Sequence, residues 1–206
     1  MRRSRILSPA AAAVEWPLAD PLQPLAFPEI FGRTAPVEVD LGCGDGSFLA
    51  AMAERHLERN YLGCERMIGR VRSACRRIAA RGLTNARIVR VELLAGVTEL
   101  LPAASVDVCH LLFPDPWPKR RHHCRRIFTE EFLRRLLSAL KPGGVLHLAT
   151  DDADYFGQMQ RVLGGTPGLE EMEELPDWPV TTFEQRFRAL GSPVHRVLLR
   201  KVSEVM

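Results

Sequence analysis

The chain lacks the features that mark membrane, secreted or metal-stapled proteins. No run approaches the roughly twenty apolar residues of a membrane span. Its five cysteines are odd in number and widely spaced, and none forms a C-x-x-C pair, which argues against a disulfide framework and a zinc knuckle. The stretch before Glu15 only loosely imitates a signal peptide, because Ser8 and Pro9 interrupt its apolar residues. We therefore expect a cytoplasmic protein.

The chain also has little net charge, +3 from 28 Lys and Arg against 25 Asp and Glu, so the overall balance does not indicate a nucleic-acid binder. Positive charge is instead local. Residues 119–126 contain five cations and two histidines with no acid to neutralise them. This local excess suggests a polyanionic partner.

Length and hydrophobic content predict one core. A chain of 206 residues with 46% hydrophobic residues forms a single domain of ordinary size. We expect a proline-rich N-terminal arm over residues 1–36, where closely spaced prolines prevent a long helix, and a folded domain over residues 37–206.

From Val37 onward, short β-rich runs alternate with helical segments. This alternation predicts an α/β fold of the Rossmann-like, doubly wound kind, with a mostly parallel seven-stranded sheet and an antiparallel last strand. The expected strands are Val37–Leu41, Tyr61–Cys64, Ile88–Val91, Val106–Phe113, Val145–Ala149 and Val194–Val202. The expected helices begin at Ser47 and cover Ile68–Arg81, Val97–Leu101, Phe128–Leu140 and Tyr155–Leu163.

Acidic residues recur where the predicted strands end. They are Asp40, Glu65, Glu92, Asp115 and Asp151. In an open parallel sheet, ligands bind outside the carboxyl ends of the strands. Any one acid there can simply face solvent, but five at one edge indicate a ligand rich in hydrogen-bond donors.

The first strand runs into Gly42-x-Gly44-x-Gly46, which allows a tight turn close to a ligand. The dinucleotide fingerprint has its third glycine one position later, where this chain has Ser47. The turn followed by Glu65 and Glu92 therefore favours a ligand that carries adenosine without a second nucleotide.

The stretch from Leu112 to Arg126 combines an acid fixed between Pro114 and Pro116 with the basic run. Trp117 suits either base stacking or covering a core. His122, His123 and Cys124 are adjacent, a spacing that does not suit a closed tetrahedral metal site, so no metal is expected.

Several motifs resemble those of known enzymes. D-L-G-C-G-D-G and L-K-P-G-G resemble motifs of class I S-adenosylmethionine-dependent methyltransferases. More specifically, F-P-D-P-W-P-K-R-R-H-H-C-R-R, T-D-D and T-T-F-E-Q-R-F resemble tRNA (guanine-N7)-methyltransferases, and the resemblance covers Val37 to about Val202. It implies methyl transfer from S-adenosyl-L-methionine to N7 of a guanine in the tRNA variable loop.

The resemblance also implies roles for individual residues. The matching cofactor-binding positions are Asp40, Gly42, Gly44, Glu65, Glu92 and Asp115, the last of which is also catalytic. Substrate-binding positions are Lys119, Asp151, Thr181, Thr182, Phe183 and Glu184, the last four forming a segment that closes over the target. The tRNA-contacting positions are Arg121, His122, His123, Arg125 and Arg126.

The sequence departs from the family pattern at a few positions. Asp40 stands where Glu is more usual, Glu92 where Asp or Asn is more usual, and Cys124 where Lys is common. Because N7 of guanine already carries a lone pair, Asp115 is expected to orient the base and stabilise positive charge on it, not to remove a proton.

Two other functions use the same features. A nicotinamide-dependent oxidoreductase shares the fold but is disfavoured by Ser47, and a non-enzymatic RNA-binding module leaves the acids at the strand ends without a role. The sequence is compatible with a monomer or a homodimer.

Overall fold

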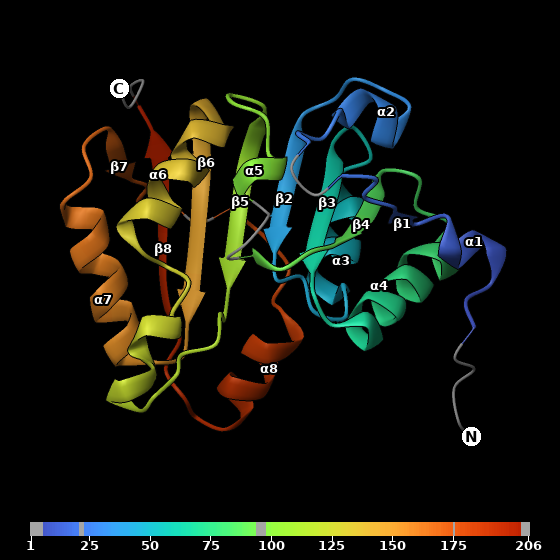
Figure 1. The fold of residues 1–206 in the computed structure, drawn as a ribbon. Coiled ribbons are helices and arrows are strands. Elements are labelled where there is room, and N and C mark those ends of the chain that lie inside the picture. The colour runs from blue at the N-terminus through green and yellow to red at the C-terminus, as the bar shows by residue number, and fades with distance from the viewer. Residues whose placement is uncertain (1–5, 21–22, 94–97, 175, 203–206) are drawn as a thin grey trace.

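The computed structural model describes residues 6–20, 23–93, 98–174 and 176–202, which form one eight-stranded sheet with helices on both faces (Figure 1). The strand order is β1-β4-β3-β2-β5-β6-β8-β7, and every pairing is parallel except those that β8 makes with β6 and β7. The strands are β1 (Glu15–Trp16), β2 (Val37–Leu41), β3 (Asn60–Glu65), β4 (Ala86–Arg90), β5 (Val106–Leu112), β6 (Leu140–Thr150), β7 (Leu169–Glu171) and β8 (His195–Lys201). The doubly wound fold is confirmed, with eight strands instead of seven.

One of the two strands outside the expected ranges, β1, comes from the N-terminal arm, and the other is β7. β1 pairs in parallel with β4, matching Glu15 to Ile88 and Trp16 to Val89. Prolines on either side of this segment exclude a long helix but permit a short edge strand. The arm's two helices, α1 (Pro9–Ala12) and α2 (Phe27–Phe31), are equally short.

Two hydrophobic layers enclose the sheet. One face packs against α1, α3 (Ser47–Arg55) and α4 (Ile68–Ala80). The other face packs against α2, α5 (Thr98–Leu100), α6 (Glu130–Ala139) and α7 (Ala153–Gly164). The parallel strands β2 to β6 end at one shared edge, which is the lower edge of the sheet in Figure 1, whereas the antiparallel β8 ends at the opposite edge.

Most expected elements are present with small shifts in their ends. The predicted strand Val37–Leu41 is confirmed without change, and the helix expected over Val97–Leu101 is α5, with Val97 outside the described residues. The segment Lys141–Gly144 follows helix α6 as expected, but it lies within β6, where these four residues bulge opposite the single residue Asp107 of β5. The 3-10 helix η2 (Arg120–Arg125), strand β7 and helix α8 (Thr182–Ala189) were not predicted.

A row of polar side chains crosses three central strands inside the molecule. His110 Nε2 lies 3.0 Å from Glu38 Oε2, and His110 Nδ1 lies 3.0 Å from His147 Nδ1. The Trp178 ring covers both imidazoles, at centroid distances of 4.9 Å from His110 and 4.7 Å from His147. Burial, together with His110 and Arg196, lowers the pKa of His147.

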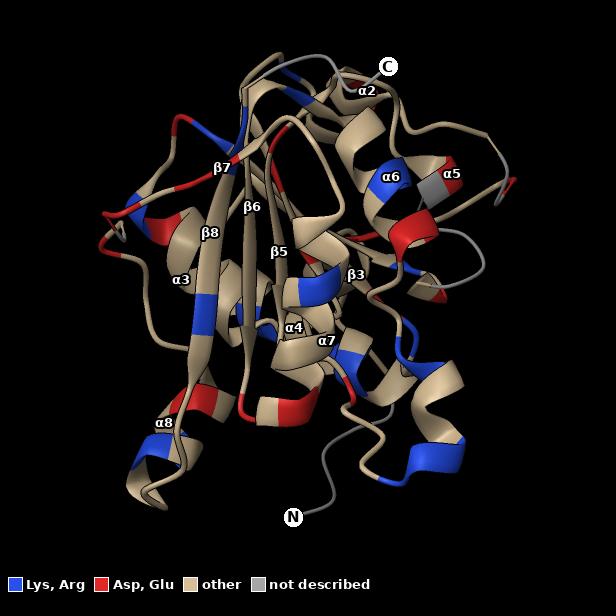
Figure 2. Cartoon of the chain, turned by 90° about the vertical axis from the view of Figure 1, so that its left-hand side faces the viewer, with Lys and Arg blue, Asp and Glu red and all other residues tan. Residues whose placement is uncertain are grey.

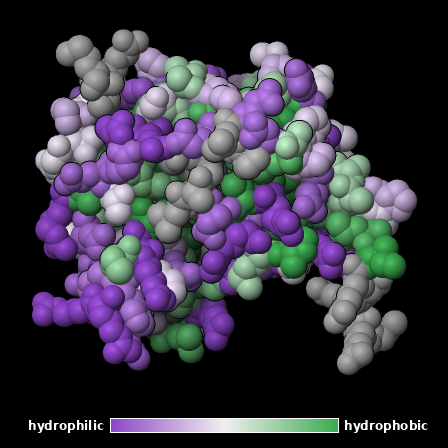
Figure 3. Space-filling model, in the orientation of Figure 1, coloured by the Kyte–Doolittle hydropathy of each residue, from purple (hydrophilic) through white to green (hydrophobic). Residues whose placement is uncertain are grey.

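Hydrophilic side chains cover most of the face shown in Figure 3, and the hydrophobic ones form separate patches. Across the described ranges, no helix has both the length and the apolar character that a bilayer crossing requires.

Candidate active site

The glycine turn joins β2 to α3 at the carboxyl edge of the sheet. Gly42, Gly44 and Gly46 have φ of 85°, 58° and 72°, a left-handed conformation that strains other residues. The Gly42 amide donates to the Cys64 carbonyl at 2.9 Å, which holds the turn against β3. A Cβ on Gly46 would lie 2.7 Å from Ala74 Cβ, so the third glycine is required where α3 packs against α4.

Two carboxyl groups lie buried beside this turn. Glu65 is 5% exposed, accepts a hydrogen bond from the Met67 amide at 2.8 Å, and faces Arg70 Nη1 at 3.8 Å. Asp40 is 4% exposed, and its carboxyl group receives no hydrogen bond from any described residue. Burial, and then the charge of Glu65, raise the pKa of Asp40 to about 7. A buried carboxyl without a donor suits a ligand that brings hydroxyl or ammonium groups.

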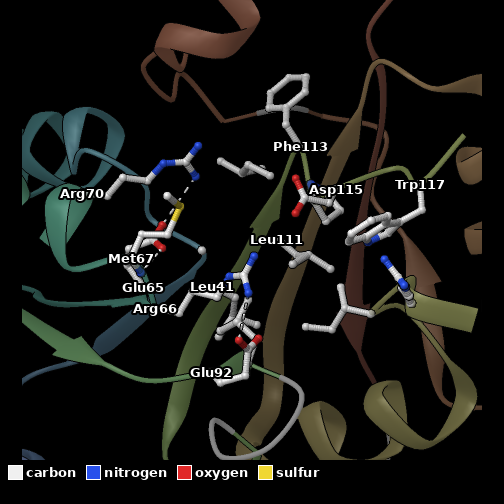
Figure 4. Close-up of a pocket in the computed structure, with 16 residues that line it drawn as sticks. Leu41, Glu65, Arg66, Met67, Arg70, Glu92, Leu111, Phe113, Asp115 and Trp117 are labelled. Carbon is white, nitrogen blue, oxygen red and sulfur yellow. Dashed lines mark hydrogen bonds and ion pairs between the residues drawn. The ribbon is translucent and has the colours of Figure 1, made fainter. Parts of the chain in front are cut away.

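A cavity of about 550 Å³ opens in front of these strand ends. Figure 4 shows Glu65 and Met67 on one side, Asp115 and Trp117 on the opposite side, and Leu41 and Leu111 between them. Its wall comprises Leu41, Gly42, Glu65, Arg66, Met67, Arg70, Glu92, Leu93, Leu111, Leu112, Phe113, Pro114, Asp115, Trp117, Arg125 and Ile127. The cavity therefore spans from the ends of β3 and β4 to the loop after β5.

Asp115 lies in a loop whose backbone is strained on both sides of it. Phe113 and Trp117 adopt left-handed φ values of 52° and 46°, which are uncommon for bulky residues. Arg126 Nε donates to the Pro116 carbonyl at 2.7 Å and holds the loop from beneath. The Asp115 side chain is consequently exposed and directed into the cavity (Figure 4).

The basic run forms η2, which projects at the carboxyl edge and appears as the blue turn at the lower right of Figure 2. Lys119, Arg121 and Arg125 are exposed there, whereas His122 and His123 are half-buried.

Arg126, which was expected to contact tRNA, lies inside the protein in this structure. It is 2% exposed, and its guanidinium group binds Asp154 at 2.7 Å and Gln158 at 3.0 Å. It also lies over the Tyr155 ring, 4.8 Å from the centroid. Arg126 therefore anchors the loop internally and cannot reach a phosphate in this conformation.

The segment 181–184 divides into structural and exposed residues. Thr181 caps α8 by accepting a hydrogen bond from the Glu184 amide at 2.9 Å. Glu184 is fully buried, with one carboxylate oxygen 2.5 Å from Arg188 and the other 2.5 Å from Arg196. Its carboxylate is therefore engaged within the protein, and a contact between Glu184 and substrate stays a prediction.

Thr182 and Phe183 are the exposed members of this segment. Thr182 Oγ1 lies 2.8 Å from Ser47 Oγ on α3, and the Phe183 ring lies 6.0 Å from the Arg70 guanidinium carbon. Phe183 therefore lies beside a residue of the cavity wall, and Thr182 links α8 to the start of α3.

The structure brings together on the cavity wall a subset of the expected residues, namely Gly42, Glu65, Glu92, Asp115 and Arg125. Others lie outside the wall, namely Asp40, Gly44, Lys119, Asp151 and Thr181–Glu184. Sequence reasoning missed several wall residues, namely Met67, Arg70, Leu111, Phe113 and Ile127. Arg70 alone carried a signal, since it lies one helical turn beyond Arg66 near the end of β3.

Comparison with solved structures establishes the fold. The 16S rRNA methyltransferase KamB superposes with a TM-score of 0.60 at 16% identity, covering 85% of this chain and 91% of that chain. The aminoglycoside resistance methyltransferase NpmB1 superposes with a TM-score of 0.57 at 20% identity, covering 85% and 92%.

Sequence comparison identifies the family. The family model described as "Putative methyltransferase" matches residues 34–197. A tRNA (guanine-N(7)-)-methyltransferase of Dechloromonas aromatica is 41% identical over 184 residues, covering 87% of this chain and 75% of the relative. One of Cutibacterium acnes is 38% identical over 188 residues, covering 87% and 68%. The chain therefore belongs to the tRNA (guanine-N(7)-)-methyltransferase family.

Proposed function

We propose that this protein transfers a methyl group from S-adenosyl-L-methionine to N7 of a guanine in the tRNA variable loop, in the cytoplasm. The observation that carries this proposal is the cavity that has Glu65, the buried acid at the end of β3, on one side and Asp115, next to the cationic η2, on the other. The names of the relatives support the same reaction.

The residues beside the glycine turn suit the cofactor. Asp40 and Glu65 supply buried carboxyl oxygens for its hydroxyl and ammonium groups, and Gly42 allows close approach to the backbone. Glu92, which pairs with Arg66 at 3.3 Å, contributes a more exposed acid at the next strand end. When bound there, S-adenosyl-L-methionine supplies a methyl group on a positively charged sulfur.

Asp115 then acts on the target base. N7 of guanine attacks with its own lone pair, so no proton has to be removed. As the new N–C bond forms, the bond between the methyl carbon and sulfur breaks with its electron pair left on sulfur, so the positive charge moves from sulfur to the base. An exposed carboxylate on the cavity wall can hold the donor edge of guanine and stabilise that charge. The strained loop fixes the carboxylate before the base arrives, which reduces the ordering needed on binding.

The exposed cations of η2 suit the tRNA backbone. Lys119 and Arg121 lie outside the cavity wall, where they can neutralise phosphates and set the register of the RNA without reading its bases.

Asp115→Asn tests the proposal because it removes the charge and keeps the shape. Methylation of unmodified tRNA should fall by about 10²–10³-fold, while retention of tRNA stays close to that of the wild type. Asp177→Asn, at an exposed acid outside the cavity, is the matched control and should retain full activity.

The modified nucleotide should be mapped in the same assay. Full turnover by the Asp115→Asn protein would remove Asp115 from the mechanism, and methyl at a position other than guanine N7 would overturn the proposed specificity. RNA retention without any methyl transfer would favour a binding module, and retention of NAD in place of S-adenosyl-L-methionine would favour an oxidoreductase.

A further inference from the structure

Trp117 lies apart from the hydrophobic core, unlike the other two tryptophans. Trp16 packs against one core cluster and Trp178 against the other, whereas neither cluster in the described part of the chain includes Trp117. The half-buried indole instead lines the cavity beside Asp115 (Figure 4). A tryptophan that covers no core and faces a cavity has the placement of a ligand-binding ring.

The backbone is strained at this position. Trp117 has a left-handed φ of 46°, and it precedes Pro118. The proline ring clashes with the preceding residue when that residue is helical, so an extended backbone would be favoured at Trp117. Such strain persists only where the surroundings determine the conformation, and it is concentrated at functional sites. Here the determining contact is buried Arg126, which binds the preceding carbonyl of Pro116 at 2.7 Å.

The indole already accepts a planar cation. The guanidinium carbon of Arg125 lies 4.9 Å from the ring centroid, and the His122 ring meets the indole edge at 5.9 Å with an interplanar angle of 89°. Arg125 also lines the cavity, so the wall next to Asp115 includes an indole with a guanidinium group over its ring. Another flat group that enters beside Asp115 can extend this stack.

We propose that Trp117 is a stacking residue for the target guanine and that it favours methyl transfer itself more than tRNA binding. This inference rests on the proposed function. Guanine gains positive charge as its N7 is methylated, and the face of an indole attracts a flat cation more strongly than a neutral ring. The contact therefore strengthens on the way to the transition state and raises the rate of the chemical step.

Three substitutions separate aromatic stacking from simple filling of space. W117F keeps a flat ring, W117L keeps apolar bulk without one, and W16L makes the same change at a tryptophan packed on the core. Single-turnover methylation at saturating tRNA should stay within about threefold of the wild type for W117F and W16L. It should fall by about 5–30-fold for W117L, the range expected for a partly desolvated contact between a cation and an aromatic ring.

Binding measurements accompany the rates. Cofactor and tRNA retention should be nearly unchanged in W117L, because phosphate contacts on η2 carry most of the tRNA affinity. Equal rates for W117L and W117F would overturn the inference.

Tryptophan fluorescence gives a second readout that does not depend on the leucine variant folding. Excess tRNA should quench the fluorescence of the wild type more than that of W117F, because a stacked base quenches an indole. Equal quenching would also overturn the inference.

The proposed function and the stacking role of Trp117 are contradicted by different results. A wild type that forms no 7-methylguanine contradicts the proposed function, whereas a wild type that does so alongside a fully active W117L contradicts stacking alone.

Discussion

Asp40→Asn should stabilise the protein in the absence of cofactor, and the gain should depend on pH. The Asp40 carboxyl is 4% exposed, has no hydrogen-bond donor among the described residues, and lies near the charge of Glu65. These surroundings raise its pKa from 3.8 to about 7. The ionised form is therefore the costly one, and an amide of the same shape avoids that cost.

The magnitude follows from the shift in pKa. Each unit corresponds to about 1.4 kcal/mol, so ionising Asp40 in the folded protein costs up to ~4 kcal/mol. Below about pH 4, Asp40 is protonated in both the folded and the unfolded chain, so its burial does not lower the stability. Because the pKa of the folded protein is raised, stability is lost as the pH rises from about 4 to about 7. For a chain of this length, ~2–4 kcal/mol corresponds to roughly 5–10 °C in Tm.

Thermal unfolding of the cofactor-free protein between pH 5 and pH 8 measures this effect. Asp40→Asn should unfold several degrees above the wild type at pH 8, and the difference should shrink toward pH 5. Asp107→Asn is the matched control, because Asp107 Oδ2 accepts hydrogen bonds from the Val37 amide and from Lys141 Nζ, both at 2.8 Å. That variant should be less stable than the wild type at pH 8. The reasoning is refuted if Asp40→Asn brings no gain at pH 8 or a gain that is independent of pH.

Two further predictions concern packing around the cavity. Gly46→Ala should lower the free energy of unfolding by about 2–3 kcal/mol, since the φ of Gly46 is 72° and the new Cβ would press on Ala74 of α4. Gly69→Ala is the control: its new Cβ meets nothing within 4 Å, so it should be neutral or stabilising by up to ~1 kcal/mol. Urea unfolding compares the two, and equal midpoints would contradict the close approach of α3 to α4. Glu184→Gln should weaken the buried pair with Arg196 and speed hydrogen exchange in α8, while exchange in α7 stays unchanged as the internal control. Unaltered exchange in α8 would show that the pair does not hold this helix.

The sheet was predictable because its signals are local. Val37–Leu41 forms a buried strand as expected, because a short β-rich run between Pro36 and Gly42 has few alternatives. β1 was not predictable, since two residues carry no periodicity and the strand exists only because it pairs with β4. Helix α8 has a largely polar sequence, and it is fixed by Arg196, which comes from β8.

The candidate site was predictable to the extent that topology places it. Asp40 and Glu65 meet because the carboxyl ends of adjacent parallel strands share one edge. The role of Arg126 was not predictable, because its partner Asp154 lies 28 residues away and nothing in the run 119–126 distinguishes a buried arginine from an exposed one. The orientation of Trp117 depends on a backbone conformation that sequence patterns do not specify.

The polar row inside the sheet fixes how the central strands are aligned along their length. With His147 neutral, His110 can donate from Nε2 to Glu38 and accept at Nδ1 from His147. The two hydrogen bonds then point in the same direction across β2, β5 and β6. A slip of β5 by one residue would turn His110 to the opposite face and leave Glu38 without this partner. Side chains thus specify the alignment of β5 and β6 in addition to the backbone hydrogen bonds. This alignment fixes where along the sheet β5 ends and the loop that carries Asp115 begins.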